Sequence, residues 1–375
     1  MKFEWIRMRD VPRDIWAVFD QIRNADSRYD DPLFDPLFAR LVGECRPDTW
    51  LAMAIDGGEM VGFWPMHRAG EGWARPVGGP FADCHAPVVA PGFRLDPADF
   101  LSGLGLAGMT VTGYTPRPGE TCRTGERTGA HLSLLDKGID HFFAEQNRMF
   151  PKHHKKMRRI RRNLRRGRHE VTVIHGDVRA DHLDRLIMLK RRQYLETGRH
   201  DVLSSDWAGR FVERLRSVSG PRFEAVLTTL CIDGQFAAGA LNLCSDRVVH
   251  GWLTAFDRDF APFSPGLLLV DEILRAMPAR GQSVYDAGPG LGHYKQYHCN
   301  AMRPLDCGVL LSGAAGLSPA RWFASGWRTV EHIAPKPAAR LMGKVRRRSD
   351  QILVSETDLA ARARGFVGAA RRRRR

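Results

Sequence analysis

Long hydrophobic segments are missing from this 375-residue chain, although 43% of its residues are hydrophobic. Its apolar runs are broken by glycine or proline, and none approaches the roughly 20 residues that a helix needs to cross a bilayer. Residues 1–5 contain an acid and no apolar segment follows them, so they do not resemble a signal peptide. The hydrophobic fraction still excludes a disordered chain, and the length suffices for two domains of ordinary size.

Cysteine motifs are also missing. The seven cysteines are an odd number, and no two of them form a C-x-x-C pair. This pattern predicts buried, reduced thiols in a cytoplasmic protein. His153 and His154 lie in a basic stretch without carboxylates, so we predict no metal site. The chain also lacks the G-x-S-x-G turn of hydrolases, a P-loop and a cysteine-protease signature.

Acidic residues are scarce in two segments, and this scarcity explains the net charge of +15. Residues 152–168 hold ten Lys or Arg and no acid, and residues 340–375 hold twelve Lys or Arg against three acids. The two segments together carry +19, which leaves −4 for the rest of the chain. A nearly neutral body with two basic segments predicts a polyanionic partner.

A repeated motif indicates a duplicated domain. Residues 55–62 and 232–239 both read I-D-G-x-x-x-x-G between apolar, β-rich runs, and an Asp-Gly step in that setting predicts a hairpin. Helix-like segments precede both motifs. We therefore predict an α/β fold of two tandem copies, with mixed sheets flanked by helices and a degenerate first copy. The predicted domains are residues 1–145, residues 146–312 and a basic tail, 313–375, that is amphipathic or disordered.

The segment from Lys152 to Arg168 joins the two copies. Met157, Ile160 and Leu164 share one face of a predicted helix whose other faces are basic. This pattern fits a linker helix docked by its apolar stripe, and it fits equally a cationic wall for phosphates or acidic sugars.

The tail combines aromatic and basic residues. A Ser-Pro step at 318–319 predicts a helix start, and the apolar side chains that follow share one side of that helix. The composition suits the anionic inner face of the cell membrane, and it suits equally a helix packed on the body. The apolar residues are Trp322, Phe323, Trp327, Val330 and Ile333, and the candidate phosphate-binding arginines are Arg340, Arg346, Arg347 and Arg348.

The stretch from residue 261 to residue 297 holds the candidate site. A turn at Ser264, Pro265 and Gly266 starts an apolar helix, and the first amide groups of that helix, at Leu267 and Leu268, are predicted to face a bound phosphate. The alternative is an ordinary core helix.

A predicted strand, residues 284–287, then ends in a glycine-rich loop, where α/β sheets commonly bind ligands. Asp286, His293 and Tyr294 are candidate proton-transfer residues, and Lys295 is a candidate partner for a phosphate or carboxylate. In the alternative, Asp286 caps its own loop and Tyr294 packs at the surface. Lys190, Arg191 and Tyr194 on an earlier predicted helix are candidate substrate-binding residues, or simply solvated.

Four of these motifs together resemble the GNAT-fold acyltransferases of the exopolysaccharide type, the CelD group, and the related FemAB-like tandem enzymes. The resemblance is strongest over residues 145–305, weaker over 1–145, and does not cover the tail. The motifs are the basic helix 156–164, the I-D-G hairpin, F-x-x-x-F-A-P-F-S-P-G-L-L at 256–268, and Y-D-A-G-P-G-x-x-x-Y-K at 285–295.

The resemblance implies tandem GNAT-like domains and an N-acetyltransferase. Acetyl-CoA would place its pyrophosphate at the Ser264 to Gly266 turn, although this turn departs from the longer glycine-rich signature of the family, and Tyr294 and Lys295 would line the donor or acceptor end. The implied acceptor is an amino sugar of a surface polysaccharide, or its sugar-nucleotide or lipid-linked precursor. No metal is implied.

The length and basic C-terminus are also similar to the holdfast polysaccharide acetyltransferases of stalked bacteria. That similarity implies a role in cell adhesion and biofilms, with cyclic-di-GMP as an effector at the tail. Two alternatives stay open. One is a FemAB-like transferase that uses aminoacyl-tRNA, although the chain lacks a long helical hairpin, so tRNA is not the expected partner. The other is a non-enzymatic, membrane-associating regulator that responds to cyclic-di-GMP.

Overall fold

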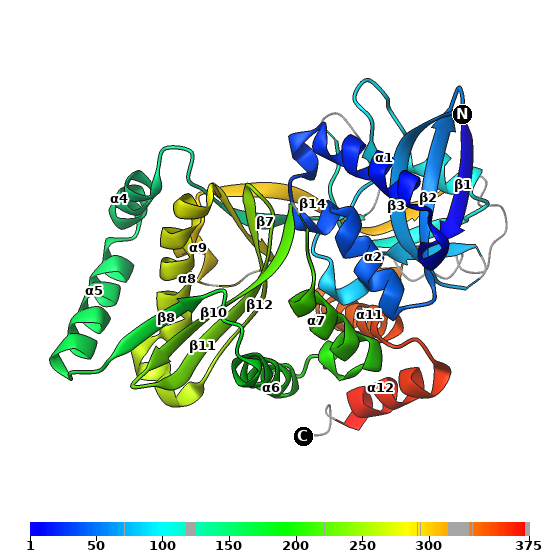
Figure 1. The fold of residues 1–375 in the computed structure, drawn as a ribbon. Helices are drawn as coiled ribbons and strands as arrows, with labels where there is room; N and C mark the ends of the chain where they lie inside the picture. The colour runs from blue at the N-terminus through cyan, green and yellow to red at the C-terminus, as the bar shows by residue number, and fades with distance from the viewer. Residues whose placement is uncertain are drawn as a thin grey trace.

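The computed structural model describes residues 1–70, 72–117, 125–220, 222–290, 292, 294–313, 330–331 and 333–371 (Figure 1). Within these residues, fourteen strands form one continuous mixed sheet that helices flank. The main path of the sheet runs β1-β2-β3-β4-β6-β14-β7-β13-β12-β11-β10-β8. Outside this path, β5 pairs with β3 and β9 pairs with β10. This architecture confirms the predicted fold class.

Each half of the sheet has an antiparallel series that ends in one parallel pair. In the first half the parallel pair is β4 with β6, and in the second half it is β12 with β13. A helix lies between the two members of each pair in the sequence. The first-half strands are β1 (Lys2–Arg7), β2 (Thr49–Asp56), β3 (Glu59–Arg68), β4 (Trp73–Pro76), β5 (Val88–Val89) and β6 (Gly108–Tyr114), with helices α1 (Arg13–Asn24), α2 (Pro36–Cys45) and α3 (Pro97–Gly103).

The second half repeats this order. Its strands are β8 (Val171–His175), β9 (Ser219–Gly220), β10 (Phe223–Ile232), β11 (Gln235–Cys244), β12 (Val248–Phe256) and β13 (Val284–Pro289). Its helices are α4 (Ile139–Met149), α5 (Pro151–Arg166), α6 (Ala180–Glu196), α7 (Asp206–Ser217), α8 (Pro265–Ala276) and the short α9 (Lys295–His298).

The two halves are joined by two strands that each lie beside the other half. Strand β7 (Gly125–Leu134) pairs with β13, and β14 (Ala301–Leu311) pairs with β6, while β7 and β14 pair with each other. Thus β7, which follows the first half in sequence, completes the sheet of the second half. One continuous sheet includes strands from both sides of the predicted boundary between residues 145 and 146. This boundary between two domains therefore stays a prediction.

The I-D-G repeats form the two predicted hairpins. In the turn between β2 and β3, Gly57 and Gly58 have φ values of 58° and 92°. In the turn between β10 and β11, Asp233 and Gly234 have φ values of 52° and 75°. Two central residues with positive φ match the twist of a tight hairpin, and glycine or aspartate at the first position followed by glycine at the second suits these φ values.

Aromatic side chains pack the two halves together. Phe81, from the Gly/Pro-rich middle of the first half, lies 5.3 Å from the Trp207 ring centroid and 5.4 Å from that of Trp252. Phe38 on α2 meets Phe211 on α7 edge-on at 5.7 Å. All five side chains except the half-buried Trp252 belong to one buried cluster that spans both halves. The halves therefore share a core.

The basic helix α5 docks by its apolar stripe. Met157, Ile160 and Leu164 are buried against α4, α8 and the sheet, as predicted. Arg161 adds ion pairs to Asp271 at 2.7 Å and to Glu272 at 2.8 Å on α8. The remaining cations of α5 are exposed. The helix itself lies at one end of the molecule (Figure 1).

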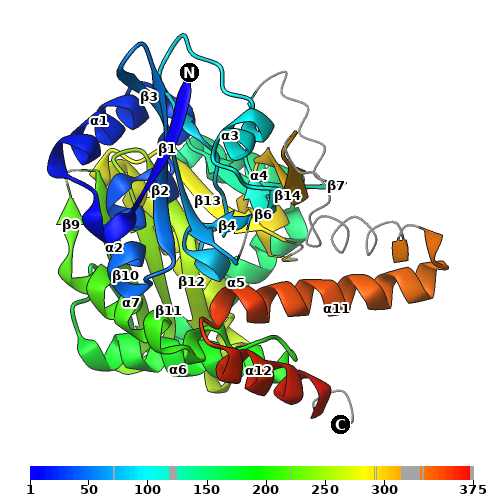
Figure 2. The ribbon, with the colours of Figure 1, turned by 90° about the vertical axis from the view of Figure 1, so that its right-hand side faces the viewer.

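The tail contains two helices, α11 (Lys336–Ser355) and α12 (Leu359–Arg371). Figure 2 shows α11 extending away from the body at its N-terminal end, with its C-terminal end against the body. Residues 318–329, including the predicted helix start and three of the predicted apolar residues, lie outside the described residues. Val330 and Ile333 are exposed. None of the helices in the described residues combines the length and the hydrophobicity needed to span a membrane.

The docked end of α11 is held by hydrogen bonds from both halves. Arg46 and Arg75 donate to the carbonyls of Val354 and Leu353 at 2.7 and 3.0 Å. Trp207 Nε1 donates to the carbonyl of Ser355 at 2.7 Å. His200 Nε2 lies 3.1 Å from a Glu356 carboxylate oxygen, and Ile352 is fully buried. Of the two forms predicted for the tail, the disordered one is therefore wrong for this segment, because its backbone supplies the hydrogen-bond acceptors for donors of the body.

Candidate functional site

The parallel strands β12 and β13 separate at the centre of the candidate site. Their pairing ends at His250 and Asp286, after which β12 continues beside β11 and β13 continues beside β7. Helix α8 begins beyond the end of β12, as the sequence predicts. A Cβ added at Gly266 would lie 3.6 Å from the Phe256 ring, an ordinary contact, so the start of α8 adjoins the end of β12.

The start of α8 offers fewer free amide groups than the sequence predicts. Ser264 has φ 49° and ψ 52°, and its carbonyl accepts hydrogen bonds from Leu267 at 3.0 Å and from Leu268 at 3.2 Å. The predicted role of these two amides in anion binding is therefore wrong. Pro265 has no N–H. The Gly266 amide has no partner among the described residues, so it is the donor that remains for a ligand.

The glycine-rich loop after β13 is held by Lys295. Its ammonium donates to the carbonyls of Gly288 at 2.9 Å and Pro289 at 2.7 Å, and the side chain is buried. The ammonium that was predicted to contact a phosphate thus binds backbone carbonyls and stabilises the loop. Tyr294 is 41% exposed beside it. His293, the third candidate of this loop, lies outside the described residues.

Asp286 is buried, and its contacts argue against the predicted role as a base that touches substrate. One carboxylate oxygen accepts from the Gly288 amide at 2.7 Å, which matches the alternative interpretation of a loop cap. The other accepts from Arg303 of β14 at 2.5 Å. Burial raises the pKa of Asp286, with His250 and Arg303 acting in the opposite direction. The residue therefore fixes the loop and the strand junction.

His250 lies fully buried among three carboxylates. Its Nδ1 is 3.2 Å from Asp31 and 3.9 Å from Asp286, and its Nε2 is 3.3 Å from Asp83. Burial opposes protonation, but the Asp31 carboxylate and its neighbours raise the pKa of His250 well above its ordinary value. The ring is accordingly an imidazolium that joins both halves.

The same cluster has the composition of a metal site, because Asp31, His250 and Asp286 bring ligand atoms within 4.8 Å of one another. However, Arg303 places one guanidinium nitrogen 3.1 Å from Asp31 and 2.5 Å from Asp286. The arginine and the imidazolium supply positive charge where a cation would otherwise be required.

Asp83 is the exposed member of this network, and sequence analysis did not identify it. It lies between the ends of β6 and β13, where Gly113 and Gly288 both have positive φ. A Cβ at Gly113 would fall 2.0 Å from the Asp83 carbonyl oxygen, and one at Gly288 would fall 2.7 Å from its carboxylate. The two glycines therefore allow Asp83 to enter the junction, where its side chain stays 37% exposed.

A pocket of about 220 Å³ opens beside Asp83. Tyr194 of α6 and Trp252 of β12 line it, and Gln351 from the docked end of α11 contributes to its wall. Burial lowers the pKa of Lys190 to about 8, and Asp83 acts against this shift. Asp83 likewise opposes the lowering of the Lys295 pKa by burial. The Asp83 carboxylate thus lies close enough to influence the pKa of Lys190 on α6 and of Lys295 after β13, and both lysines are candidate site residues from the sequence.

The candidate substrate-binding residues of α6 make contacts within the protein. The Lys190 ammonium donates to the carbonyl of Thr254 at 3.1 Å and lies 5.4 Å from the Tyr194 ring centroid. The role of these two residues in substrate binding stays a prediction. Arg191 instead pairs with Asp201 at 2.8 Å.

Of the four candidate arginines of the tail, Arg346 has ion-pair partners within the protein. Arg346 pairs with Glu331 at 2.9 Å and with Glu126 at 3.0 Å. Arg347 is exposed and Arg348 half-buried on the same helix, and the side chain of Arg340 lies outside the described part of the chain. Their predicted role in nucleotide binding stays a prediction.

The sequence of this region matches a known family. Residues 151–296 match the family described as an acetyltransferase (GNAT) domain. This segment contains α5, α8, β13 and Tyr294, and it supports the predicted acyltransferase activity. It covers less than half of the chain. No curated protein matches the sequence.

Solved structures resemble nearly the whole chain in fold. FemX has a TM-score of 0.51 at 10% identity, with 82% of this chain and 96% of that chain covered. L-PGS from Bacillus licheniformis has a TM-score of 0.50 at 10% identity, with 83% and 94% covered. A tandem GNAT protein from the clavulanic acid biosynthesis pathway has a TM-score of 0.46 at 12% identity, covering 84% and 100%. At these identities the first two likenesses show the fold alone.

Proposed function

We propose that this protein transfers an acyl group from acyl-CoA, with acetyl-CoA as the leading donor, to the amine of an amino sugar. The acceptor belongs to a surface polysaccharide or to its nucleotide- or lipid-linked precursor. The observation that supports acyl transfer is the exposed Asp83 carboxylate, which lies between the Tyr294 loop and the Tyr194 pocket of a GNAT-type domain.

In the proposed reaction, the amine nitrogen attacks the thioester carbonyl carbon. A C–N bond forms, the C–S bond breaks, and the amine proton passes to the Asp83 carboxylate. The partly exposed Tyr294 hydroxyl supplies a proton to the departing thiolate. Buried His250 and Asp31 hold Asp83 in place, and holding the amine against the thioester supplies much of the rate enhancement.

The donor site is tested at the start of α8. Gly266→Trp places an indole beside Phe256 and the free amide, so we expect the variant to lose acetyl-CoA binding in calorimetry. Gly209→Trp is the matched control, because Gly209 is an exposed helical glycine of α7 with no atom within 4 Å of its Cβ position. Undiminished acetyl-CoA binding by Gly266→Trp would remove this donor site.

The base is tested at Asp83. Asp83→Asn keeps the shape of the side chain but cannot accept the amine proton, so we expect kcat for release of CoA with glucosamine to fall ~100-fold or more while acetyl-CoA affinity stays unchanged. Asp246→Asn, at an exposed carboxylate paired with Arg222, is the control. A wild-type kcat in Asp83→Asn would show that another group takes the proton.

The surface of α5 favours a second candidate, transfer from aminoacyl-tRNA. Eight of its cations are exposed: Lys152, Lys155, Lys156, Arg158, Arg159, Arg162, Arg165 and Arg166. Such a surface would bind RNA with an affinity that falls steeply as salt rises. A protein that binds tRNA at low salt, and that does not bind acetyl-CoA, would favour this candidate over the first.

A further inference from the structure

A second cavity, of about 420 Å³, lies at the first-half side of the junction. Four arginines line it from separate segments: Arg28 near the end of α1, Arg117 after β6, Arg127 on β7 and Arg303 on β14. Among the described residues, no Asp or Glu lines it. Its lining therefore presents positive charge from several directions.

Each of the four arginines is held in place by neighbouring groups. Arg28 pairs with Asp26, and Arg127 Nε donates to the buried Asp306 at 3.0 Å. Arg303 is held by Asp31 and Asp286, as described above. Arg117 donates to the Tyr29 hydroxyl at 3.0 Å and to the carbonyl of Phe93 at 3.1 Å. These contacts position the four groups. A guanidinium has five N–H donors, so one that is held through a single nitrogen can bind a ligand through its other nitrogens.

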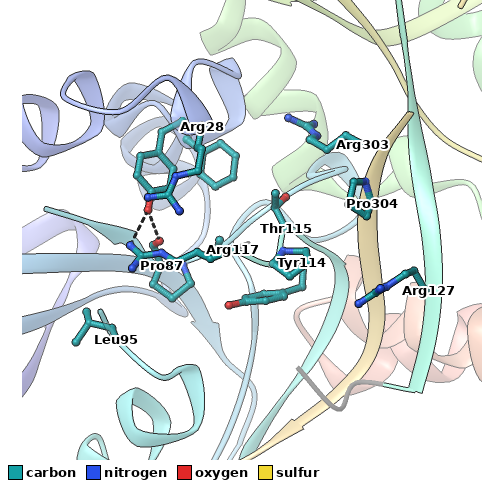
Figure 3. A pocket seen from close by; sticks show the side chains of 13 residues that line it. Arg28, Pro87, Leu95, Tyr114, Thr115, Arg117, Arg127, Arg303 and Pro304 are labelled. Atoms are coloured by element: carbon teal, nitrogen blue, oxygen red, sulfur yellow. Dashed lines mark hydrogen bonds between the residues drawn. The ribbon is translucent and has the colours of Figure 1, made fainter. Parts of the chain in front are cut away.

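The Arg127 side chain shows this most directly. Its single hydrogen bond within the described residues uses Nε, so both terminal nitrogens are available to a ligand, and 66% of the side chain is exposed. Figure 3 shows Arg127 and Arg303 on neighbouring strands at one side of the cavity, and the Arg117 side chain extending toward Pro87 at the other.

Apart from the hydroxyl groups of Tyr29, Tyr114 and Thr115, the rest of the wall is apolar, and it includes flat rings. The Tyr114 ring lies between the arginines, and Leu95 and Pro87 face it across the cavity (Figure 3). Arginine binds phosphate in bidentate fashion, and aromatic rings and proline faces favour a flat apolar group. The volume falls within the range of small-molecule sites.

We propose that this cavity binds an organic phosphate, with the phosphate on Arg117, Arg127 and Arg303 and an apolar or aromatic substituent against Tyr114 and Leu95. The site differs from the proposed donor and acceptor sites, because none of its lining residues belongs to the Asp83 pocket or to the start of α8. Arg303 is shared with the network around His250, where it pairs with Asp31 and Asp286.

The test uses the full chain without any acyl donor. Phenyl phosphate carries both parts of the proposed ligand, whereas inorganic phosphate lacks the ring and phenol lacks the charge. We expect saturable binding of phenyl phosphate in calorimetry, with inorganic phosphate weaker and phenol not binding. Absence of saturable binding of phenyl phosphate up to about 10 mM, an affinity weaker than about −3 kcal/mol, would overturn the proposal.

Variants at one arginine then locate the site. Arg117→Gln removes a charge-assisted contact and should weaken phenyl phosphate binding at least about tenfold, and Arg117→Lys should restore part of it. Arg94→Gln is the matched control, since Arg94 is exposed next to Leu95 in sequence but does not line the cavity. Equal affinities of wild type and Arg117→Gln for phenyl phosphate would mean that it binds elsewhere, and would overturn the assignment of the binding site to this cavity.

The phosphate can belong to a soluble ester or to a lipid. A second arm therefore replaces phenyl phosphate by phosphatidylcholine vesicles with and without phosphatidic acid. Binding to the acidic vesicles that Arg117→Gln weakens assigns the cavity to a lipid phosphate. An Arg117→Gln effect confined to phenyl phosphate assigns it to a soluble ester.

Discussion

His85 is a buried histidine whose ring nitrogens have no hydrogen-bond partner in the described part of the chain. The ring stacks 6.2 Å from Trp64 and meets Tyr114 edge-on at 5.7 Å. Burial lowers the pKa of His85 from 6.5 to about 3. The folded protein therefore keeps this ring neutral at pH values where the unfolded chain protonates it.

This difference predicts a loss of stability on the acid side. Between pH 6.5 and pH 5 the unfolded state binds a proton that the folded state does not, so the free energy of unfolding falls by about 2 kcal/mol through His85 alone. His85→Phe should reduce the drop between pH 7.5 and pH 5 by that amount in urea titrations. The exposed His141→Phe serves as control, and a drop in His85→Phe equal to that of wild type would contradict the prediction.

Asp83 illustrates what sequence reasoning missed at the residue scale. Its neighbours in the chain, Ala82 and Cys84, carry no motif, and the sequence predicts no site residue in the degenerate first copy. Its position depends on Gly113 and Gly288, which come from different halves of the chain. Only a tertiary contact brings these three residues together, so no local pattern reports it.

At the scale of elements, α5 tests whether a highly charged helix is held on the body by its apolar stripe. Ile160 is buried in the stripe that meets α4 and α8, so Ile160→Ala should lower the free energy of unfolding by about 2–4 kcal/mol. Arg159→Ala, at an exposed cation of the same helix, should change it by less than about 0.5 kcal/mol. Equal, small effects of the two substitutions in urea denaturation would mean that α5 is not docked by its stripe.

The elements that sequence predicted well are those with a local signal. The hairpins follow from Asp-Gly steps between apolar runs, and α5 and α8 follow from apolar spacing with proline at the start. The amides of Leu267 and Leu268 were predicted wrongly because the left-handed Ser264 turns its own carbonyl toward them. The sequence also could not predict the partners of Lys295 and Asp286. Lys295 binds backbone carbonyls, and Asp286 binds Arg303, which lies outside the motif.

For the whole molecule, the docked end of α11 makes the C-terminus part of the folded body. A chain that ends at Gly313 removes the partners of Arg46, Arg75, Trp207 and His200, and buried donors left unsatisfied are costly. We expect its free energy of unfolding to fall by at least about 3 kcal/mol.

A chain that ends at Asp358 is the matched comparison. It lacks α12 but keeps all four contacts, so its thermal midpoint should stay closer to that of the full chain. Equal stability of the two truncated chains would show that the docked segment contributes little. Loss of membrane or nucleotide binding on truncation at Gly313 has to be separated from this general destabilisation.

The central strands set an order on folding. β6 and β7 are successive in the chain, yet β14 lies between them in the sheet, and β14 is synthesised only after the whole second half. At 5–20 residues per second, the ribosome needs roughly 10–30 s to make the intervening residues. Throughout that interval β6 and β7 lack their common partner β14, and any pairing between the two would have to open before β14 could enter. The middle of the sheet can therefore be completed only after β14 has been made.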